Sequence, residues 1–221
     1  MTRGRGPRPG PPRSPRMPRS EAARARRLLL CATGGYQCYA LPGFVLALLR
    51  HAADDVQVVL SRAAARLVSP LAVEAASRHP AYIEMEDRGP DVFVPHIELG
   101  RNVDLVLVYP ATVSVVGKVA GGIADELIPA LILATSAPVF FVPIANPLMW
   151  THPAVRRNVK TLRADGYVVL PPLPAVEVAT REGLFETAEP FPYPTLLARM
   201  AAVFKGKAKL GIPARENEGL T

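Results

Sequence analysis

Short apolar runs recur along this chain, and the segments between them carry apolar residues at helical spacing. A strand that is buried on both faces of a parallel sheet is almost continuously apolar, and four runs fit that description. They are residues 26–35, 56–61, 104–110 and 137–143, and weaker strands are expected at 81–85 and 167–172.

Helices are predicted in most of the intervening segments. They are residues 39–52, 63–77, 96–103, 111–136, 152–166 and 194–204, with a loop at 86–95. The first should become regular near Pro42, the second is broken near Pro70, and three glycines weaken the start of the fourth. This alternation of strands and helices favours a single α/β domain, in which helices cover both faces of a parallel sheet.

The segment Leu127–Trp150 is uncharged and long enough to resemble a membrane span. Four prolines interrupt it, and its pattern divides into the end of a helix, a turn and a strand. We therefore predict a buried helix-turn-strand unit and no membrane partner.

The chain has 221 residues and is 49% hydrophobic, enough for the core of one domain, which we place at residues 24–204. Residues 1–23 form an Arg/Pro-rich tail that is expected to be disordered, and residues 205–221 form a basic tail. Residues 1–20 and 205–221 carry +6 and +2 of the formal charge of +7, which leaves about −1 for the rest of the chain. No nucleic-acid partner is therefore expected.

The only cysteines are Cys31 and Cys38, and their spacing does not form a metal-binding pair. Reduced thiols and no metal site are predicted. The N-terminus shows no secretory signal, so a cytoplasmic location is expected.

A glycine pair in residues 31–40, CATGGYQCYA, separates the first strand from the first helix. Backbone N–H groups at such a turn bind phosphate, and glycine lets the anion approach closely. The segment matches neither GxGxxG nor the Walker pattern, so a plain tight turn is an equal alternative.

Polar candidates follow the later strands. His96 is a natural base near neutral pH, although a structural role is commoner for a single histidine. Thr112 and Ser114 suit hydrogen bonding to a flat heterocycle or a carboxylate, with helix capping as the alternative. In PIANPLMW, residues 143–150, a buried Asn146 beside Trp150 could line a rigid pocket at the sheet edge.

Taken together and in this order, these segments resemble the homo-oligomeric flavin-containing cysteine decarboxylases. That family includes phosphopantothenoylcysteine decarboxylase and the peptidyl-cysteine decarboxylases of lanthipeptide-like pathways. The resemblance covers about Arg27 to Gly183. Its motifs are the turn ATGGYQC, His96-Ile97, residues 110–115, the run GKVAGGIADELI, and Pro143, Asn146, Met149 and Trp150.

The resemblance implies a Rossmann-like (flavodoxin-like) three-layer fold and FMN as cofactor. His96 would be the base and Asn146 would hold the substrate carboxylate, while Ser114 and Met149 would contact the substrate. The site would lie between subunits of a homotrimer, and such trimers often form dodecamers. The FMN contacts implied are Gly34, Gly35, Tyr36 and Ser61 for the phosphate, and Pro110, Ala111, Thr112, Val113 and Ile144 for the ring.

The function implied is FMN-dependent oxidative decarboxylation of the C-terminal cysteine of a ribosomally made precursor peptide. Phosphopantothenoylcysteine enzymes have a cysteine in a later flap, and Ala179 stands at about that place here, which favours the peptide branch. Gly35, Ser114 and Ala145 also depart from the family pattern. The alternatives are phosphopantothenoylcysteine decarboxylation in coenzyme A biosynthesis, flavin prenyl transfer, and a non-catalytic flavin-binding regulatory subunit.

Overall fold

The computed structural model describes residues 25–101 and 103–171. Both predicted tails, the segment around Ala179 and the helix at 194–204 lie outside these residues. The strands are β1 (Ala25–Ala32), β2 (Ala53–Leu60), β3 (Leu105–Thr112), β4 (Val139–Ile144) and β5 (Val168–Val169). The helices are the 3-10 helix η1 (Tyr36–Ala40) and the α-helices α1 (Leu41–His51), α2 (Arg62–Ala65), α3 (Pro70–Ser77), α4 (Pro95–Arg101), α5 (Val113–Ala120), α6 (Leu127–Ala134), α7 (Pro147–Thr151) and α8 (Pro153–Ala164).

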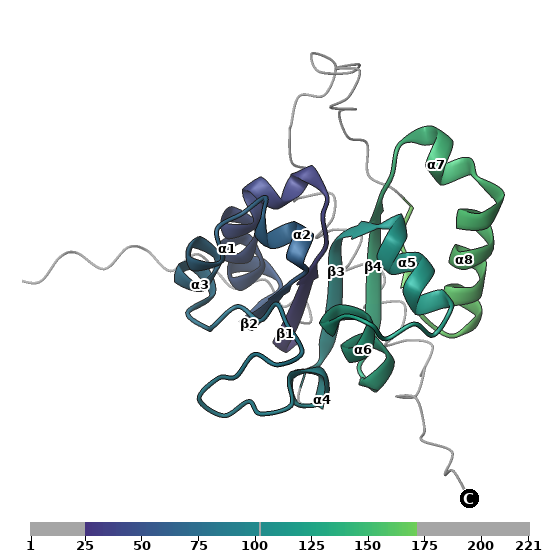
Figure 1. Cartoon of the computed structure of the whole chain (residues 1–221). Coiled ribbons are helices and arrows are strands. Elements are labelled where there is room, and N and C mark those ends of the chain that lie inside the picture. Colours follow the sequence, from purple (N-terminus) through teal and green to yellow (C-terminus); the bar gives the residue numbers. More distant parts are fainter. Residues whose placement is uncertain (1–24, 102, 172–221) are drawn as a thin grey trace, which may run out of the picture.

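The five strands form one sheet in the order β2-β1-β3-β4-β5, and every neighbouring pair is parallel (Figure 1). This order confirms the predicted flavodoxin-like α/β fold. The direction of strand succession reverses between β1 and β3, and a crevice at such a point is where ligands bind in open parallel sheets.

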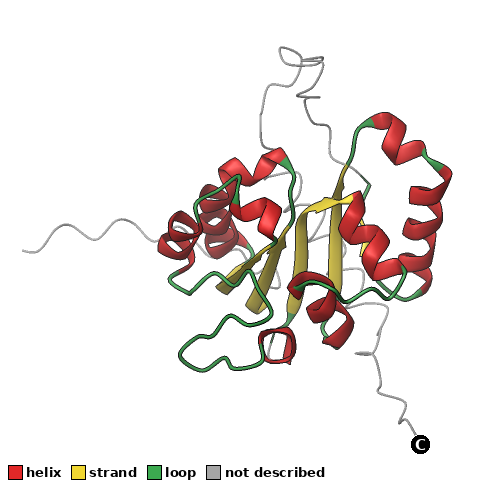
Figure 2. Cartoon of the chain, in the orientation of Figure 1, coloured by secondary structure: helices red, strands yellow, loops and turns green. Residues whose placement is uncertain are grey.

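The strands are apolar throughout because both of their faces are covered. In β1, Leu28 and Leu30 belong to one buried cluster, whereas Leu29 and Cys31 belong to the other. Helices α1 and α3 cover the first face, and α4, α5, α6 and α8 cover the second (Figure 2). The result is the expected three-layer arrangement.

The predicted strand at 81–85 is wrong, because only Tyr82 bridges to β2, at Val59. The carboxylate of Asp87 accepts hydrogen bonds from the backbone N–H groups of Ile83 and Glu84, at 2.7 and 3.0 Å. These N–H groups therefore close a turn and do not extend the ladder.

The single helix expected within residues 111–136 is two helices, α5 and α6. Gly121 ends α5, and Gly122 adopts a φ of +68°, a conformation that glycine tolerates without a Cβ penalty.

The uncharged segment 127–150 contains the predicted helix and strand, which are α6 and β4, and it also includes most of the short helix α7, which was not predicted. None of the helices in the described part of the chain is long and apolar enough to cross a membrane.

Candidate functional site

Most of the predicted site residues lie at the carboxyl edge of the sheet. Because the strands are parallel, the segments that follow β1, β2, β3 and β4 all emerge at this edge. The structure places there Gly34, Gly35, Tyr36, Ser61, Pro110, Ala111, Thr112, Val113, Ser114, Ile144, Asn146 and Met149. Residues distant in sequence thus lie along one edge of the sheet, on both sides of the point where the strand order reverses.

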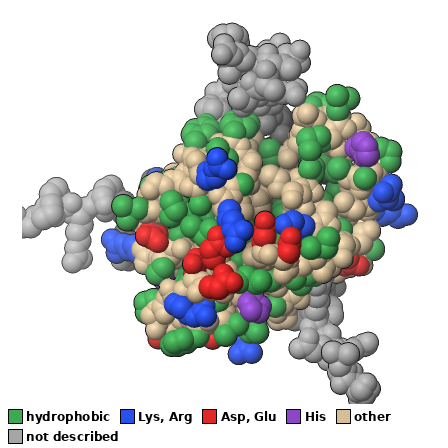
Figure 3. Space-filling model, viewed as in Figure 1, with side chains coloured by type: hydrophobic (Ala, Val, Ile, Leu, Met, Phe, Trp, Pro, Cys, Tyr) green, Lys and Arg blue, Asp and Glu red, His purple; other side chains and the backbone are tan. Residues whose placement is uncertain are grey.

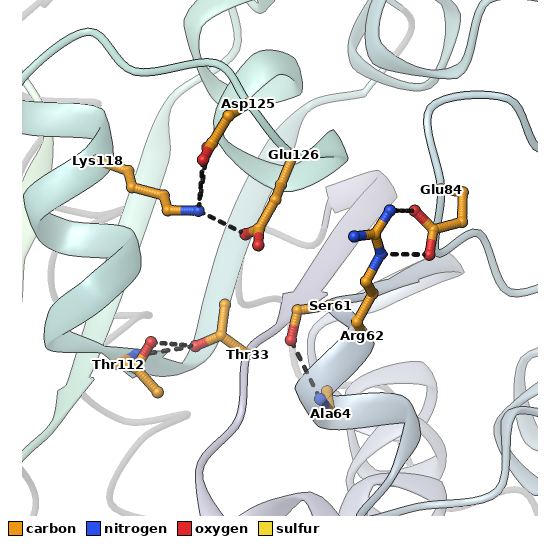
Figure 4. Close-up of polar contacts among 9 residues, drawn as sticks. All are labelled: Thr33, Ser61, Arg62, Ala64, Glu84, Thr112, Lys118, Asp125 and Glu126. Atoms are coloured by element: carbon orange, nitrogen blue, oxygen red, sulfur yellow. Dashed lines mark hydrogen bonds and ion pairs between the residues drawn. The ribbon is translucent and has the colours of Figure 1, made fainter.

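Thr33 links the turn after β1 to the end of β3 through hydrogen bonds, and the sequence analysis did not select this residue. Its hydroxyl donates to the carbonyl oxygen of Pro110 at 2.8 Å and lies 3.1 Å from the hydroxyl of Thr112 (Figure 4). The same oxygen accepts the backbone N–H of Thr112 at 2.9 Å. Thr33 is buried, so these bonds fix the glycine turn against the end of β3. Thr112 stands at the N-cap of α5 without a capping side-chain bond, since its hydroxyl meets Thr33 instead.

The glycine turn presents fewer free N–H groups than predicted. The N–H of Gly35 donates to the carbonyl oxygen of Thr33 at 2.6 Å, so it is not open to an anion in this conformation. Gly34 is exposed, and its N–H has no acceptor among the described residues. A Cβ at Gly34 would lie 2.6 Å from the Cβ of Ala63. The turn therefore approaches α2 more closely than a residue with a Cβ atom would allow.

Ser61 caps α2, and its side-chain oxygen accepts the N–H of Ala64 at 3.1 Å (Figure 4). Its hydroxyl hydrogen remains able to donate to an acceptor at the edge. Ser61 also lines a cleft with Arg62, Glu84 and residues 125–128.

The cations near this cleft are already paired with carboxylates. Arg62 contacts Glu84 through two bonds of 2.6 and 2.7 Å, and this bonding raises the pKa of the guanidinium and lowers the pKa of Glu84. Lys118 lies 3.0 Å from Asp125 and 3.1 Å from Glu126, and the hydrogen bond to Asp125 is the main cause of its raised pKa. Acidic and basic side chains are accordingly mixed in the middle of the face in Figure 3.

Asn146 is exposed, which corrects the expectation of a buried amide. It is the N-cap of α7, and its Oδ1 accepts the backbone N–H of Met149 at 2.8 Å. This bond assigns the two ends of the amide, because a backbone donor must meet the oxygen. The Nδ2 group is thereby left as a donor at the sheet edge. Trp150 is half-buried and packs against the second core cluster.

Backbone pairing between β3 and β4 holds the ends of these two strands together beside Asn146. Ala111 pairs with Pro143 and Thr112 with Ile144, after a register irregularity between Val108 and Ala111. Ser114 is exposed in the first turn of α5.

The structure does not bring His96 to this edge within one subunit. His96 lies on α4, which leads into the amino end of β3, whereas Asn146 follows the carboxyl end of β4. Eight strand residues at about 3.3 Å each separate the two edges by roughly 26 Å. His96 is half-buried, and its Nδ1 atom has no hydrogen-bond partner in the described part of the chain.

Gln37 is a second residue that the sequence reasoning did not select. It lies in η1, is 3% exposed, and both polar atoms of its amide are buried without a hydrogen-bond partner among residues 25–101 and 103–171. Native proteins leave few such atoms unpaired, and each requires an explanation.

Comparisons with known proteins agree with this architecture. A family model described as Flavoprotein matches residues 16–189. The coenzyme A biosynthesis bifunctional protein CoaBC of Bacillus subtilis is 40% identical over 148 residues, which cover 66% of this chain and 36% of that protein. The protein of the same name from Vibrio cholerae is 32% identical over 186 residues, which cover 84% of this chain and 46% of that protein. The match therefore spans less than half the length of these curated relatives.

Two solved structures are also similar. One is described as the FMN-dependent cysteine decarboxylase TvaF from thioviridamide biosynthesis, with 31% identity and a TM-score of 0.60, covering 66% of this chain and 90% of that one. The other is the FMN-dependent cysteine decarboxylase SpaF, with 32% identity and a TM-score of 0.60, covering 74% of this chain and 97% of that one.

Proposed function

The chain belongs to the Flavoprotein family, and from that premise we propose that it decarboxylates the carboxylate of a cysteine with FMN as its cofactor. The observation that carries this proposal is the carboxyl edge of the sheet. There the glycine turn, the end of β3 and the amide of Asn146 lie along one edge of the sheet, next to the point where the strand order reverses. A phosphate, a flat ring and a carboxylate have complementary groups at these three places.

The residues at the crevice fit FMN. The free N–H of Gly34 and the hydroxyl of Ser61 can donate to its phosphate, with Gly35 and Tyr36 beside them. Residues 110–113 and Ile144 would lie along the ring. The unpartnered amide of Gln37 is a feature expected of a surface that meets a ligand. When bound, FMN would supply the oxidation of the cysteine, as the acceptor of a hydride from its Cβ atom.

Asn146 would hold the substrate carboxylate through Nδ2. Its Oδ1 is occupied by the N–H of Met149, so the amide cannot turn its acceptor toward the carboxylate without losing the cap. A neutral donor orients the carboxylate without the strong ground-state stabilisation of a full positive charge, which would oppose the loss of CO2. Met149 and Ser114 are exposed nearby and would contact the rest of the substrate.

His96 would accept the thiol proton of the cysteine, a role for which an imidazole is suitable. Since His96 and Asn146 lie at opposite edges of one subunit, the histidine would have to come from a neighbouring subunit. This requirement supports a homotrimer, or a dodecamer built from trimers, with each site shared between two copies.

Two substrate classes follow, and the curated relatives favour the smaller one. Both relatives are named for coenzyme A biosynthesis, which supports phosphopantothenoylcysteine, the alternative of the sequence analysis. The similarity to TvaF from thioviridamide biosynthesis, at 31% identity, supports a second candidate, the C-terminal cysteine of a precursor peptide.

Mass spectrometry of products from the two substrates tests the proposal. We expect the loss of CO2 from phosphopantothenoylcysteine. Loss of CO2 and two hydrogens from Cys-terminated peptides, with no reaction of the small substrate, would instead assign the protein to the peptide branch. A protein that binds FMN but converts neither substrate would refute decarboxylation and favour a regulatory role or prenyl transfer.

A further inference from the structure

The amide of Gln37 lies where the two halves of the crevice meet. A Cβ atom built on Gly35 would lie 2.9 Å from Oε1 of Gln37 and 2.9 Å from Cβ of Pro110. Gly35 belongs to the turn that follows β1, and Pro110 to the end of β3. The space that a side chain at position 35 would need is therefore bordered by the Gln37 amide on one side and Pro110 on the other.

Gln37 is unusual because its whole polar group is unsatisfied. Nε2 and Oε1 are both buried and have no partner in the described part of the chain, although Thr33, Thr112 and Ser61 nearby are all bonded. Burying an amide without a hydrogen bond destabilises the folded protein. An apolar side chain of similar length would avoid that cost, so the amide is better explained by a ligand than by packing.

The chemistry of the amide limits what that ligand group is. An amide offers one acceptor oxygen and a donor nitrogen, so a group that satisfies both ends must itself donate and accept. A phosphate dianion only accepts, and it would leave Oε1 unpaired. A hydroxyl group does both.

We propose that the Gln37 amide binds the ribityl hydroxyls of FMN. This rests on the proposed function in one respect, namely that FMN occupies the crevice. In FMN the ribityl chain joins the phosphate to the ring, and the position that a Cβ on Gly35 would occupy, 2.9 Å from both Oε1 of Gln37 and Cβ of Pro110, lies between the glycine turn and the end of β3. Gln37 is thus a cofactor-positioning residue that lies outside the set of residues implied by the sequence.

The test compares FMN with riboflavin, which keeps the ribityl chain and lacks the phosphate. Dissociation constants are measured by quenching of flavin fluorescence for the wild type, Gln37→Leu and Ser61→Ala, and the melting temperature of each apoprotein is recorded. Gln37→Leu should weaken FMN and riboflavin by the same factor, about tenfold or more, since one ordinary hydrogen bond corresponds to about tenfold in affinity. Ser61→Ala should weaken FMN more than riboflavin.

The melting temperature of the apoprotein gives a second readout, and it should rise in the variant whose flavin affinity falls. Because Gln37→Leu removes a buried unpaired amide, the flavin-free variant should melt at a higher temperature than the wild type. Gln37→Met, which is unbranched, repeats the measurement if leucine does not fit the site. A variant that is less stable without flavin would show that the amide has a structural partner and would overturn the proposal.

The remaining outcomes are also decisive. Unchanged affinity for both flavins, or weakening of FMN alone, would refute the assignment to the ribityl chain while leaving the proposed function intact. A wild-type protein that binds neither flavin would overturn both.

Discussion

Replacement of Asn146 by aspartate isolates the proposed role of its Nδ2 group. Aspartate is nearly isosteric with asparagine, and it caps helices about as well, so the bond to the N–H of Met149 should persist. The variant therefore keeps the fold of α7 while it replaces the donor that faces the substrate with a second negatively charged oxygen.

The expected magnitude follows from two terms. The loss of a charge-assisted hydrogen bond to a carboxylate costs roughly 1.5–3 kcal/mol. Two carboxylates about 4 Å apart repel by about 1 kcal/mol if water screens them and by about 4 kcal/mol at the effective dielectric constant of a protein surface. Together these amount to at least about 2.5 kcal/mol, which corresponds to roughly a 70-fold loss or more in kcat/KM.

The assay is the release of CO2 from phosphopantothenoylcysteine and from a Cys-terminated peptide, with melting temperature and FMN content measured on the same samples. Asn146→Asp should retain both the fold and the flavin, and it should lose activity on whichever substrate is the natural one. A variant with activity within threefold of the wild type would refute the placement of the carboxylate at Asn146.

Three further predictions concern the fold and the assembly. Thr33→Val keeps the shape of the side chain but removes its buried hydrogen bond to the carbonyl oxygen of Pro110 and leaves the part-buried N–H of Thr112 without its acceptor. Urea unfolding should therefore show a loss of about 1–3 kcal/mol, and an unchanged midpoint would contradict this role of Thr33. Burial raises the pKa of the Cys38 thiol from its ordinary value of 9.0 to about 12, so between these values only the unfolded state loses the proton. The free energy of unfolding should therefore fall as the pH rises through this window. Cys38→Ala should reduce that fall, and a variant with the same pH profile as the wild type would contradict the assignment to Cys38. If the protein forms the proposed trimer with shared sites, an equal mixture of His96→Asn and Asn146→Asp subunits should regain about a quarter of the wild-type activity, because that share of the sites has both native residues. No recovery in mixed trimers, confirmed by native mass spectrometry, would refute a site that combines His96 of one subunit with Asn146 of another.

Much of the fold follows from local pattern. The four strong strands are buried on both faces, and a strand of this kind needs the continuous apolar run that the sequence shows. The weak strand at 81–85 fails because the carboxylate of Asp87 captures the backbone N–H groups of Ile83 and Glu84, a contact that apolar spacing does not reveal.

The site was predictable in part. Its motifs fall at the carboxyl edge because parallel strands deliver their following residues to one place. The exposure of Asn146 could not be read from its apolar neighbours, since it depends on the short helix that the residue caps. The separation of His96 from Asn146 depends on the fold, and Thr33 and Gln37 emerge only from atomic contacts.

The paired cations near the crevice have a consequence for how an anion arrives. Arg62 and Lys118 are both neutralised by carboxylates, so the described part of the cleft presents little net positive potential to an approaching phosphate. Long-range attraction would then add little to the association rate, and recognition would depend on dipoles that act only at contact. Flavin capture should accordingly vary weakly with ionic strength, so that the protein would bind its cofactor at a similar rate at low and at high salt concentration.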